Sequence, residues 1–165
     1  DGFIARSDHT LDWLSKQVTE GEDHGFDAFM KSVDVIVMGT GSFRTVLGFD
    51  EWPYSKPVVV MSGSMTEQDI PDRLKDKVEF SALDPADLMA SFDARGYSRV
   101  YVDGGAIIRS FLKLQLIQDM KVTIVPILIG SGIRLFGDSA EDVDLKLDSV
   151  EEFPSGLVSL NYRLI

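Results

Sequence analysis

The chain has 165 residues and carries 27 Asp and Glu against 16 Lys and Arg, which gives a net charge of −11 at pH 7. This length suits one domain with one buried core, and the acidic balance argues against a nucleic-acid binder, which needs clustered Lys and Arg. There is no cysteine, which excludes disulfides, thiolate catalysis and Cys-ligated metal sites. No apolar run approaches the roughly 20 residues that span a bilayer. We expect a cytoplasmic protein without membrane or nucleic-acid partners.

Short β-branched runs alternate with helical stretches from residue 26 to residue 128. One helix has a clear start and stop, since Asp84 is a typical N-cap, Pro85 suits the first helical position and Gly96 suits the stop. In chain order, the expected elements are helix 26–31, strand 33–38, strand 57–61, strand 77–80, helix 85–95, strand 99–102, helix 106–112 and strand 120–128.

The C-terminal part has a different pattern. Residues 143–153 and 157–164 alternate between apolar and polar positions and are joined by Pro154-Ser155-Gly156, which predicts an antiparallel hairpin. The earlier alternation of strands and helices predicts βαβ units and a parallel sheet with helices on both faces. The sequence therefore predicts one α/β domain over residues 1–165, with a mainly parallel sheet and a C-terminal hairpin.

Small residues follow three of the expected strands, as Gly39-Thr40-Gly41-Ser42, Ser62-Gly63-Ser64 and Gly104-Gly105-Ala106. Ligands of open α/β sheets bind beyond the carboxyl ends of the strands, and backbone amides at helix starts attract phosphate oxygens. For any one turn, a glycine that only shapes the chain is the simpler explanation. Taken together, the three turns favour a site for an extended phosphate-bearing ligand such as a dinucleotide.

The first of these turns also begins like the G-x-G-x-x-G fingerprint of Rossmann dehydrogenases, but Arg44 stands at the third glycine position. A Rossmann-type dehydrogenase is therefore an alternative that rests on Gly39 and Gly41 alone. His9 and His24 are the only histidines and lack metal-ligand spacing, so we expect no metal site and two solvent-exposed rings. The acidic run 138–144 is interpreted as a solvated loop.

Several segments resemble the dihydrofolate-reductase-like family, and most of all the reductase domain of riboflavin-biosynthesis deaminase-reductases and their stand-alone relatives. The specific segments are Val100 to Ala106, Leu116 to Met120 and Pro126 to Phe136, supported by Asp1 to Ala5, Val37 to Gly39 and Trp52-Pro53. The resemblance covers essentially the whole chain. It implies the three-layer α/β/α dihydrofolate-reductase-like fold.

The resemblance also implies a reductase that uses NADPH, with NADH as the other option. Hydride would pass to a C=N or C=O bond of a pteridine-like or pyrimidine-like substrate, as in 5-amino-6-(5-phosphoribosylamino)uracil reductase and dihydrofolate reductase. The residues implied for the cofactor lie in the three turns, and they are Gly39, Thr40, Ser42, Arg44, Ser62, Gly63, Ser64, Gly104, Gly105, Ala106 and Ile107.

The chain departs from its relatives at two positions that are often basic. Thr40 directly follows the first turn glycine, where relatives hold phosphate, so preference for the 2′-phosphorylated cofactor rests on Arg44. Phe3 follows the Asp-Gly pair, where riboflavin-pathway reductases commonly place a basic residue near the substrate ribose. The resemblance also leads us to expect a first strand that precedes Asp1.

Four residues are candidates for the substrate site. Asp1 matches the Asp-Gly pair of the family and is the first choice for a catalytic carboxylate that orients substrate and biases protonation. Asp23 and Asp27 lie where dihydrofolate reductases keep a substrate carboxylate, although acidic residues near a helix start are also common for dipole reasons. Trp13 could wall the substrate pocket or belong to the core.

Two further questions stay open at this level. A binding module on the same fold, able to hold a nucleotide or pterin without turnover, is the main alternative to the reductase. The apolar run Val122 to Ile129 and the last strand could form the surface of a homodimer, or they could be core strands.

Overall fold

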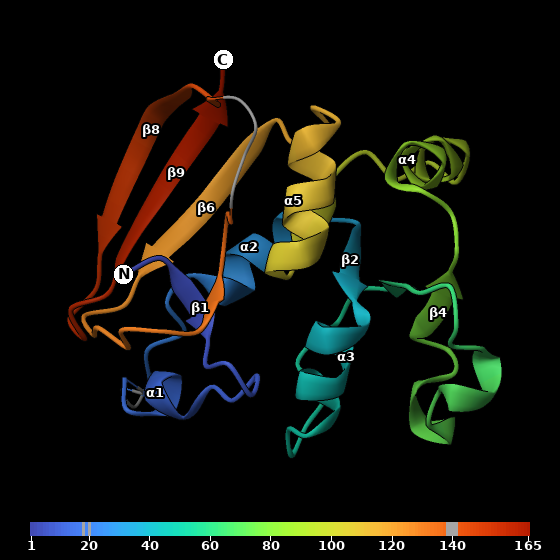
Figure 1. The fold of residues 1–165 in the computed structure, drawn as a ribbon, viewed down its shortest axis with the longest axis horizontal. Helices are drawn as coiled ribbons and strands as arrows, with labels where there is room; N and C mark the ends of the chain where they lie inside the picture. Colours follow the sequence, from blue (N-terminus) through green and yellow to red (C-terminus); the bar gives the residue numbers. More distant parts are fainter. Residues whose placement is uncertain (18, 20, 138–141) are drawn as a thin grey trace. The chain divides into compact units, whose positions relative to one another are not determined.

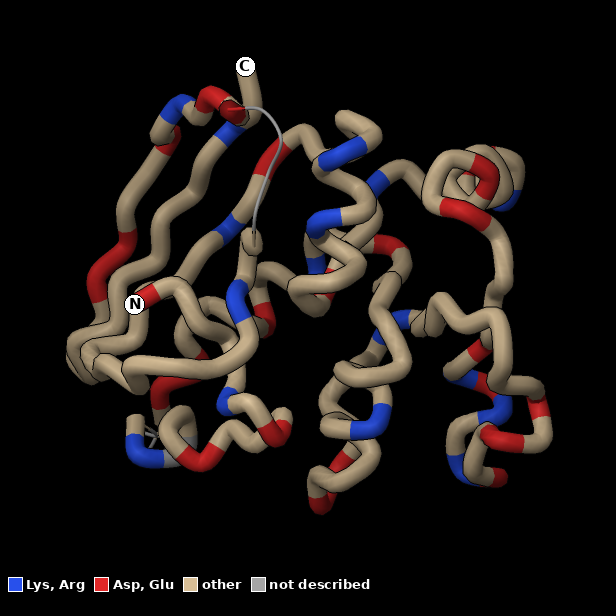
Figure 2. Tube along the Cα trace, in the orientation of Figure 1, with Lys and Arg blue, Asp and Glu red and all other residues tan. Residues whose placement is uncertain are grey.

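The computed structural model describes residues 1–17, 19, 21–137 and 142–165. They form two compact units (Figure 1). The terminal unit comprises Asp1–His24 and Phe111–Ile165, and the central unit comprises Gly25–Ser110. Acidic residues are spread along both units rather than gathered in one segment (Figure 2).

The central unit is built on a parallel sheet of four strands in the order β4-β3-β2-β5. Its strands are β2 (Val35–Gly39), β3 (Val58–Met61), β4 (Val78–Ser81) and β5 (Val100–Asp103). The helices of this part are α2 (Phe26–Ser32), α3 (Thr40–Leu47), α4 (Pro85–Ala94) and α5 (Gly105–Lys113). The residues of α5 from Phe111 onward belong to the terminal unit. Two short 3-10 turns lie at Glu67–Asp69 and Asp72–Leu74. The predicted parallel sheet flanked by helices is confirmed.

The strands of the central unit are continuous apolar runs in the sequence because their side chains are buried on both faces of the sheet. Val35 to Met38 are all fully buried, as are Val58 to Val60. Parallel strands covered on both faces lack the alternation of half-exposed strands. Phe43 of α3 and Leu74 pack into the same core, so the helix that begins at Thr40 is anchored directly beside β2.

Helix α4 begins as the sequence predicts. The Asp84 carboxylate accepts hydrogen bonds from the amides of Ala86 and Asp87, at 2.9 Å and 3.0 Å, and Pro85 occupies the first helical position. The helix ends at Ala94, and Gly96 follows with φ of +78°. Capping chemistry therefore fixes both ends of this helix.

The terminal unit contains an antiparallel sheet in the order β6-β9-β8, with β6 (Asp119–Ile124), β8 (Leu145–Glu152) and β9 (Val158–Leu164). The β8–β9 pair is the predicted C-terminal hairpin. A second antiparallel pair joins β1 (Phe3–Ala5) to β7 (Ile133–Arg134), and α1 (Asp12–Ser15) is a single turn. Gly132 is needed beside this pair, because a Cβ there would lie 2.2 Å from the Ala5 carbonyl oxygen.

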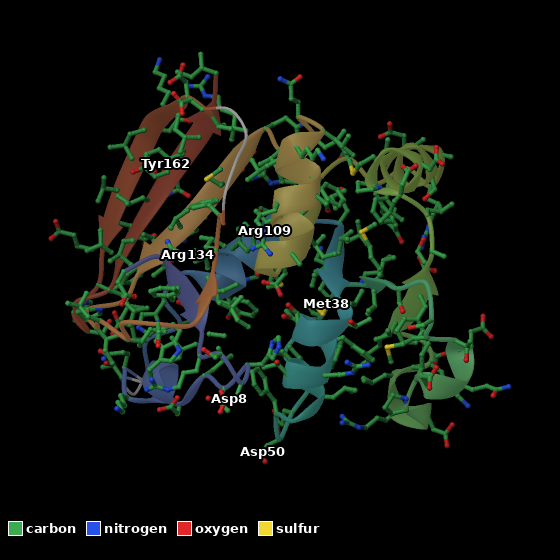
Figure 3. All side chains as sticks on the ribbon, in the orientation of Figure 1. Asp8, Met38, Asp50, Arg109, Arg134 and Tyr162 are labelled. Atoms are coloured by element: carbon green, nitrogen blue, oxygen red, sulfur yellow. The ribbon has the colours of Figure 1, made fainter. Side chains whose placement is uncertain are left out.

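One face of the β6-β9-β8 sheet is mainly apolar, with Glu152 opposite Val158 as a charged residue at the end of β8. The strand register places on it Met120, Val122, Ile124, Leu145, Leu147, Val150, Val158, Leu160, Tyr162 and Leu164. We call this set the apolar sheet face, and Tyr162 marks it on β9 (Figure 3). Leu147 and Val150 are 48% and 49% exposed. The opposite face carries polar pairs such as Arg163 with Asp148 at 2.8 Å.

One expectation for this unit was wrong, and one of its strands was not predicted. The strand expected over 120–128 ends at Ile124, because Pro126 has no N–H with which to continue a ladder, and it pairs antiparallel with β9. The strand β1 was not expected. Residues 138–141 of the acidic run lie outside the described residues, and Asp142 and Asp144 are exposed as a solvated loop requires.

Candidate active site

Two of the three small-residue turns meet in the central unit. β2 ends at Gly39 and β5 ends at Asp103, and these neighbouring parallel strands pair Met38 with Asp103, so their carboxyl ends coincide. A Cβ built on Gly104 would lie 2.5 Å from Ser42 Oγ, which shows how closely the two turns approach. Met38, just before the first turn, is labelled in Figure 3.

The third turn lies at the same edge of the sheet. β3 pairs with β2 on the other side, with Met61 opposite Gly39, so Ser62-Gly63-Ser64 follows at the same level. The Ser62 hydroxyl accepts hydrogen bonds from the amides of Ser64 and Met65, at 3.2 Å and 3.0 Å, and so closes its own turn. Nothing lies within 4 Å of a Cβ built on Gly63. The order β3-β2-β5 thus aligns all three turns.

The helix starts beside these turns suit an anion. Gly39 caps α3 without a side-chain hydrogen bond, and neither α3 nor α5 has an acidic residue in its first turn. Amides in the first turn of a helix lack intrahelical partners and carry the positive end of the helix dipole. Arg44 is exposed and lies four residues after Thr40, on the same side of α3. The residues present therefore fit a phosphate-bearing cofactor.

A carboxylate that the sequence argument left out lies at the same edge. Asp103 is half-buried, and the Tyr101 hydroxyl donates to its Oδ1 at 2.9 Å. Burial and the nearby Asp103 charge raise the pKa values of Tyr101 and Tyr54 well above the usual range, so both hydroxyls stay protonated. The signal was present in the sequence, because Asp103 directly precedes the Gly-Gly pair.

Tyr101 and Tyr54, the two tyrosines near this carboxylate, each pack against another aromatic ring. The Phe29 and Tyr101 rings meet edge to face with centroids 4.9 Å apart, and Trp52 and Tyr54 do so at 5.4 Å. The indole Nε1 of Trp52 is buried and finds no acceptor among the described residues. A buried N–H without an acceptor is costly, and the Nε1 of Trp13 in the terminal unit shares this state.

The predicted substrate residues fall in both units. Asp1 is exposed, and its Oδ2 accepts hydrogen bonds from the amides of Ile129 and Gly130, at 2.9 Å and 2.8 Å, which gives it a structural role in the terminal unit. Trp13, in the same unit, is 7% exposed and so belongs to the buried residues. Asp23 and Asp27 are exposed, in the terminal and central units respectively, and each has interaction partners of its own.

A positively charged side chain lies beside Phe3, the residue that stands where relatives commonly have a basic one. Phe3 pairs with Arg134 across β1 and β7, and the Arg134 guanidinium carbon stands 5.2 Å from the centre of the Phe3 ring. Cation–π contact of this kind attracts a guanidinium to the face of an aromatic ring. The terminal unit therefore has a positive charge next to Phe3, supplied by the neighbouring strand.

His24 does not match the expectation of an exposed ring. Its side chain is 24% exposed, its Nε2 lies 3.1 Å from Ser155 Oγ, and its ring meets Phe153 edge to face at 5.4 Å. These partners lie on the β8–β9 hairpin, far along the sequence, so the polar neighbours of His24 in the chain gave no hint of them. Among the residues described, no group of three or more His, Asp or Glu could hold a metal ion.

Comparison with known proteins places these features in a family. Residues 1–159 match the family described as the RibD C-terminal domain. The chain belongs to the RibD C-terminal domain family. YwjB of Bacillus subtilis, an uncharacterized protein, is 30% identical over 166 residues, covering 98% of this chain and 91% of YwjB.

Solved structures agree with this assignment. A protein of Shewanella sp. PV-4, whose name assigns it to riboflavin biosynthesis, matches this RibD C-terminal domain with a TM-score of 0.92 and 38% identity, over 100% of this chain and 93% of the other. A deaminase/reductase of Thermotoga maritima matches with a TM-score of 0.70 and 16% identity, and this chain spans 54% of it. The second likeness shows the fold alone.

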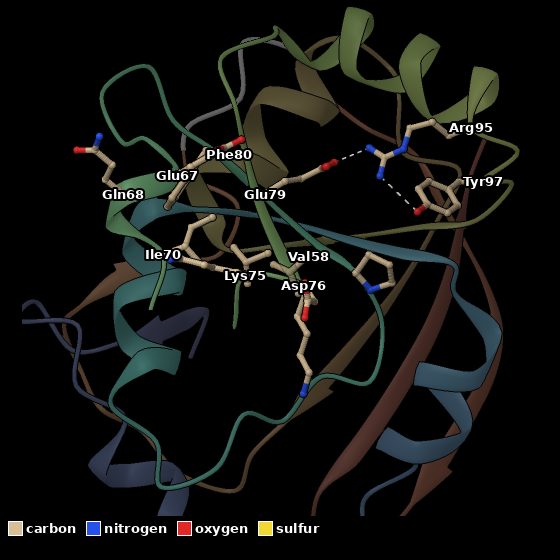
Figure 4. A pocket seen from close by; sticks show the side chains of 13 residues that line it. Val58, Glu67, Gln68, Ile70, Lys75, Asp76, Glu79, Phe80, Arg95 and Tyr97 are labelled. Carbon is tan, nitrogen blue, oxygen red and sulfur yellow. Dashed lines mark hydrogen bonds and ion pairs between the residues drawn. The ribbon is translucent and has the colours of Figure 1, made fainter. Parts of the chain in front are cut away.

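A groove of about 840 Å³ lies elsewhere on this RibD C-terminal domain, along the edge strand β4 (Figure 4). Its lining includes Lys75, Glu79 and Tyr97, with Arg95 bonded to both Glu79 and Tyr97. It contains none of the residues predicted for the cofactor. In the part of the chain that the structure describes, no helix is long and apolar enough to cross a membrane.

Proposed function

We propose that this RibD C-terminal domain is a reductase that transfers hydride from NADPH or NADH to a pteridine-like or pyrimidine-like substrate. The alignment of the three turns at one sheet edge, with Ser42 against Gly104, carries the proposal. Family membership and the likeness to a riboflavin-biosynthesis protein support it. When bound, the reduced dinucleotide supplies the hydride.

The chain's own residues would bind and orient the cofactor. The amides that begin α3 and α5 would hold its phosphates, with Gly104, Gly105, Ala106 and Ile107 at the pyrophosphate and Ser62 to Ser64 beside the adenosine ribose. Arg44 is the candidate for a 2′-phosphate, because Thr40 offers a hydroxyl but no charge at the helix start. Positioning of the two reactants is the main contribution that such a site makes to the rate.

We assign the handling of the proton to Asp103. Tyr101 stays protonated and donates to Asp103 Oδ1, which holds the carboxylate in one orientation at the cofactor edge. Asp103 would take up a proton from water and pass it to the atom next to the one that receives the hydride. Asp1 is the weaker candidate, since its Oδ2 already accepts two backbone hydrogen bonds.

Turnover tests the proposal. Purified protein is incubated with NADPH or NADH and a panel of pterins and pyrimidines, and oxidation of the reduced cofactor is followed by absorbance. Oxidation that depends on one of these compounds is expected. A second candidate function, a binding module without turnover, is favoured by the absence of basic side chains at residues 3 and 40. That module would bind cofactor and yet leave it unoxidised with every compound.

We also propose a homodimer through the apolar sheet face. Leu147, Val150 and Ile124 on that face are each nearly half exposed. A contiguous exposed apolar patch marks an interaction surface, and a second copy of the chain offers the same apolar chemistry in a two-fold arrangement.

A further inference from the structure

A pair of aromatic rings links helix α2 to Asp103 within the central unit. The Phe29 ring of α2 meets the Tyr101 ring of β5 edge to face, with the ring centres 4.9 Å apart and the ring planes at 85°. The Tyr101 hydroxyl in turn donates to Asp103 Oδ1 at 2.9 Å. Side chains two residues apart on a strand point to the same face of the sheet, so Tyr101 is well placed to reach Asp103. Two successive contacts therefore run from α2 to the carboxylate.

Tyr101 is the side chain that holds this carboxylate. In the described part of the chain, no other side chain donates to Asp103. Burial and the Asp103 charge raise the pKa of Tyr101, so its hydroxyl stays protonated and remains a donor. Phe29 and Tyr101 both pack against the buried core of the central unit. The position of Asp103 Oδ1 therefore depends on the orientation of one tyrosine ring, and Phe29 contacts that ring.

The central unit contains a second pair of the same kind in different surroundings. Phe92 of α4 meets Tyr97 edge to face, with the ring centres 5.8 Å apart. The Tyr97 hydroxyl accepts a hydrogen bond from Arg95 at 3.4 Å, and both residues line the groove along β4. Each pair sets a helix phenylalanine against a tyrosine that follows it in the chain. Only the first pair leads to a carboxylate beside the turns that we assign to the cofactor.

We propose that Phe29 is a positioning residue that holds the Asp103 carboxylate through Tyr101, which deepens and rests on the reductase function proposed above. Edge-to-face packing favours one relative orientation of two rings, so Phe29 limits the tilt of the Tyr101 ring and fixes its hydroxyl. A donor fixed in this way stabilises the charged form of the carboxyl group. With Oδ1 occupied, Oδ2 is the oxygen that would take up a proton from water and pass it on.

An NMR titration of the Asp103 carboxyl carbon tests this link without requiring turnover. Tyr101→Phe removes the donor and should raise the midpoint of the titration by about one pH unit, because a hydrogen bond to the charged form is lost. Phe29→Leu loosens the donor and should raise the midpoint by roughly half as much. Phe29→Tyr keeps the ring and should titrate like the wild type. The matched controls Phe92→Leu and Tyr97→Phe should leave the midpoint unchanged.

The double variant F29L/Y101F separates an effect through Tyr101 from a direct effect of Phe29. In Y101F, the added F29L should shift the Asp103 midpoint no further, because the contact through which it acts is already lost. The proposal is overturned if Y101F leaves the midpoint unchanged, if F29L shifts it fully in the Y101F background, or if F92L shifts it as much as F29L does.

Steady-state kinetics connects this link with the proposed reaction. With the best substrate of the panel, F29L should lower kcat about threefold and Y101F about tenfold, at nearly unchanged KM. In both variants the fall of kcat at high pH should move to higher pH, which a general loss of stability would not produce. F92L should show neither change, and an equal change in F92L would contradict the proposal. If the midpoints shift as expected but no compound is reduced, the reductase proposal fails and the link from Phe29 to Asp103 stands.

Discussion

Ser42 and Gly104 form the contact that joins two strand-end turns of the central unit. Gly104 has φ of +87°, and a Cβ on it would lie 2.5 Å from Ser42 Oγ. The position therefore needs a residue that tolerates the left-handed region, and any side chain there would force the Ser42 hydroxyl to move. Gly96 in the same unit separates the two effects. It also has a left-handed backbone, with φ of +78°, but nothing lies within 4 Å of a Cβ placed on it.

Gly104→Ala should lower the free energy of unfolding by about 2–4 kcal/mol, from left-handed strain and overlap with Ser42. Gly96→Ala should cost about 1 kcal/mol, from strain alone. Adding Ser42→Ala to G104A should recover part of the loss, since it removes the overlapping hydroxyl. Urea denaturation of the four proteins measures these differences. A cost for G104A no greater than that for G96A would contradict the tight approach of the turns.

Asp103→Asn should reduce kcat about 100-fold or more while leaving cofactor affinity intact, because the amide cannot deliver the proton. Asp1→Asn is the comparison, and it should affect turnover less than D103N does. Steady-state kinetics with the best substrate of the panel, together with cofactor titration, gives both quantities. If D1N abolished turnover and D103N retained it, the proton would have to be assigned to Asp1.

Asp34 gives the central unit a pH-dependent contribution to stability. Amide hydrogen bonds from Ser98 and Arg99, both at 2.9 Å, lower the pKa of Asp34 below the ordinary value of 3.8. A lowered native pKa means that the stabilisation is present above the unfolded value and is lost as the pH falls through the native value. Asp34→Asn should therefore be less stable than wild type at pH 7, with the difference shrinking as the pH falls below the ordinary carboxyl value of 3.8.

Urea midpoints measured across that pH range check this expectation. The exposed Asp76→Asn variant serves as the control and should follow the wild type throughout. A D34N deficit that stayed constant from neutral to acidic pH would show that the carboxylate charge is not what the two amides recognise.

Leu147→Asp should convert a dimer to a monomer, because it places a charge on the apolar sheet face. Lys146→Glu changes a charge on the opposite face of the same strand and should leave the dimer intact. Light scattering coupled to size exclusion measures the mass of each protein. A monomeric wild type would refute the homodimer, as would a dimer that L147D leaves unchanged.

Local signals in the sequence were sufficient for much of the fold. The Asp84 cap, the Gly96 stop and the turn before Leu157 lie within a few residues of the elements they bound, so composition and spacing predicted them. The strand after Leu116 was predicted in the right place but too long, because the apolar run continues past Pro126 and hydropathy alone does not register a missing N–H.

Long-range contacts were beyond such signals. Phe3 pairs with Arg134, and His24 contacts Ser155, across more than 100 residues of chain, and nothing near any of these residues indicates its partner. Some features of the candidate site were likewise predictable from local sequence, and others were not. The three glycine- and serine-rich turns were visible as strand ends, whereas the burial of Tyr101 and Tyr54 near Asp103 depends on the surroundings that folding creates.

Calorimetric titration of NADPH and NADH into the wild type and into Gly105→Val tests the cofactor site most directly, with the exposed Ala94→Val as the control. If the cofactor binds at the three turns, the wild type and A94V should each bind at least one reduced cofactor saturably. A folded G105V should not bind it, because a valine side chain would occupy the space at the start of α5 where the pyrophosphate is to be held. No binding of either cofactor to the wild type, or undiminished binding to G105V, would contradict it.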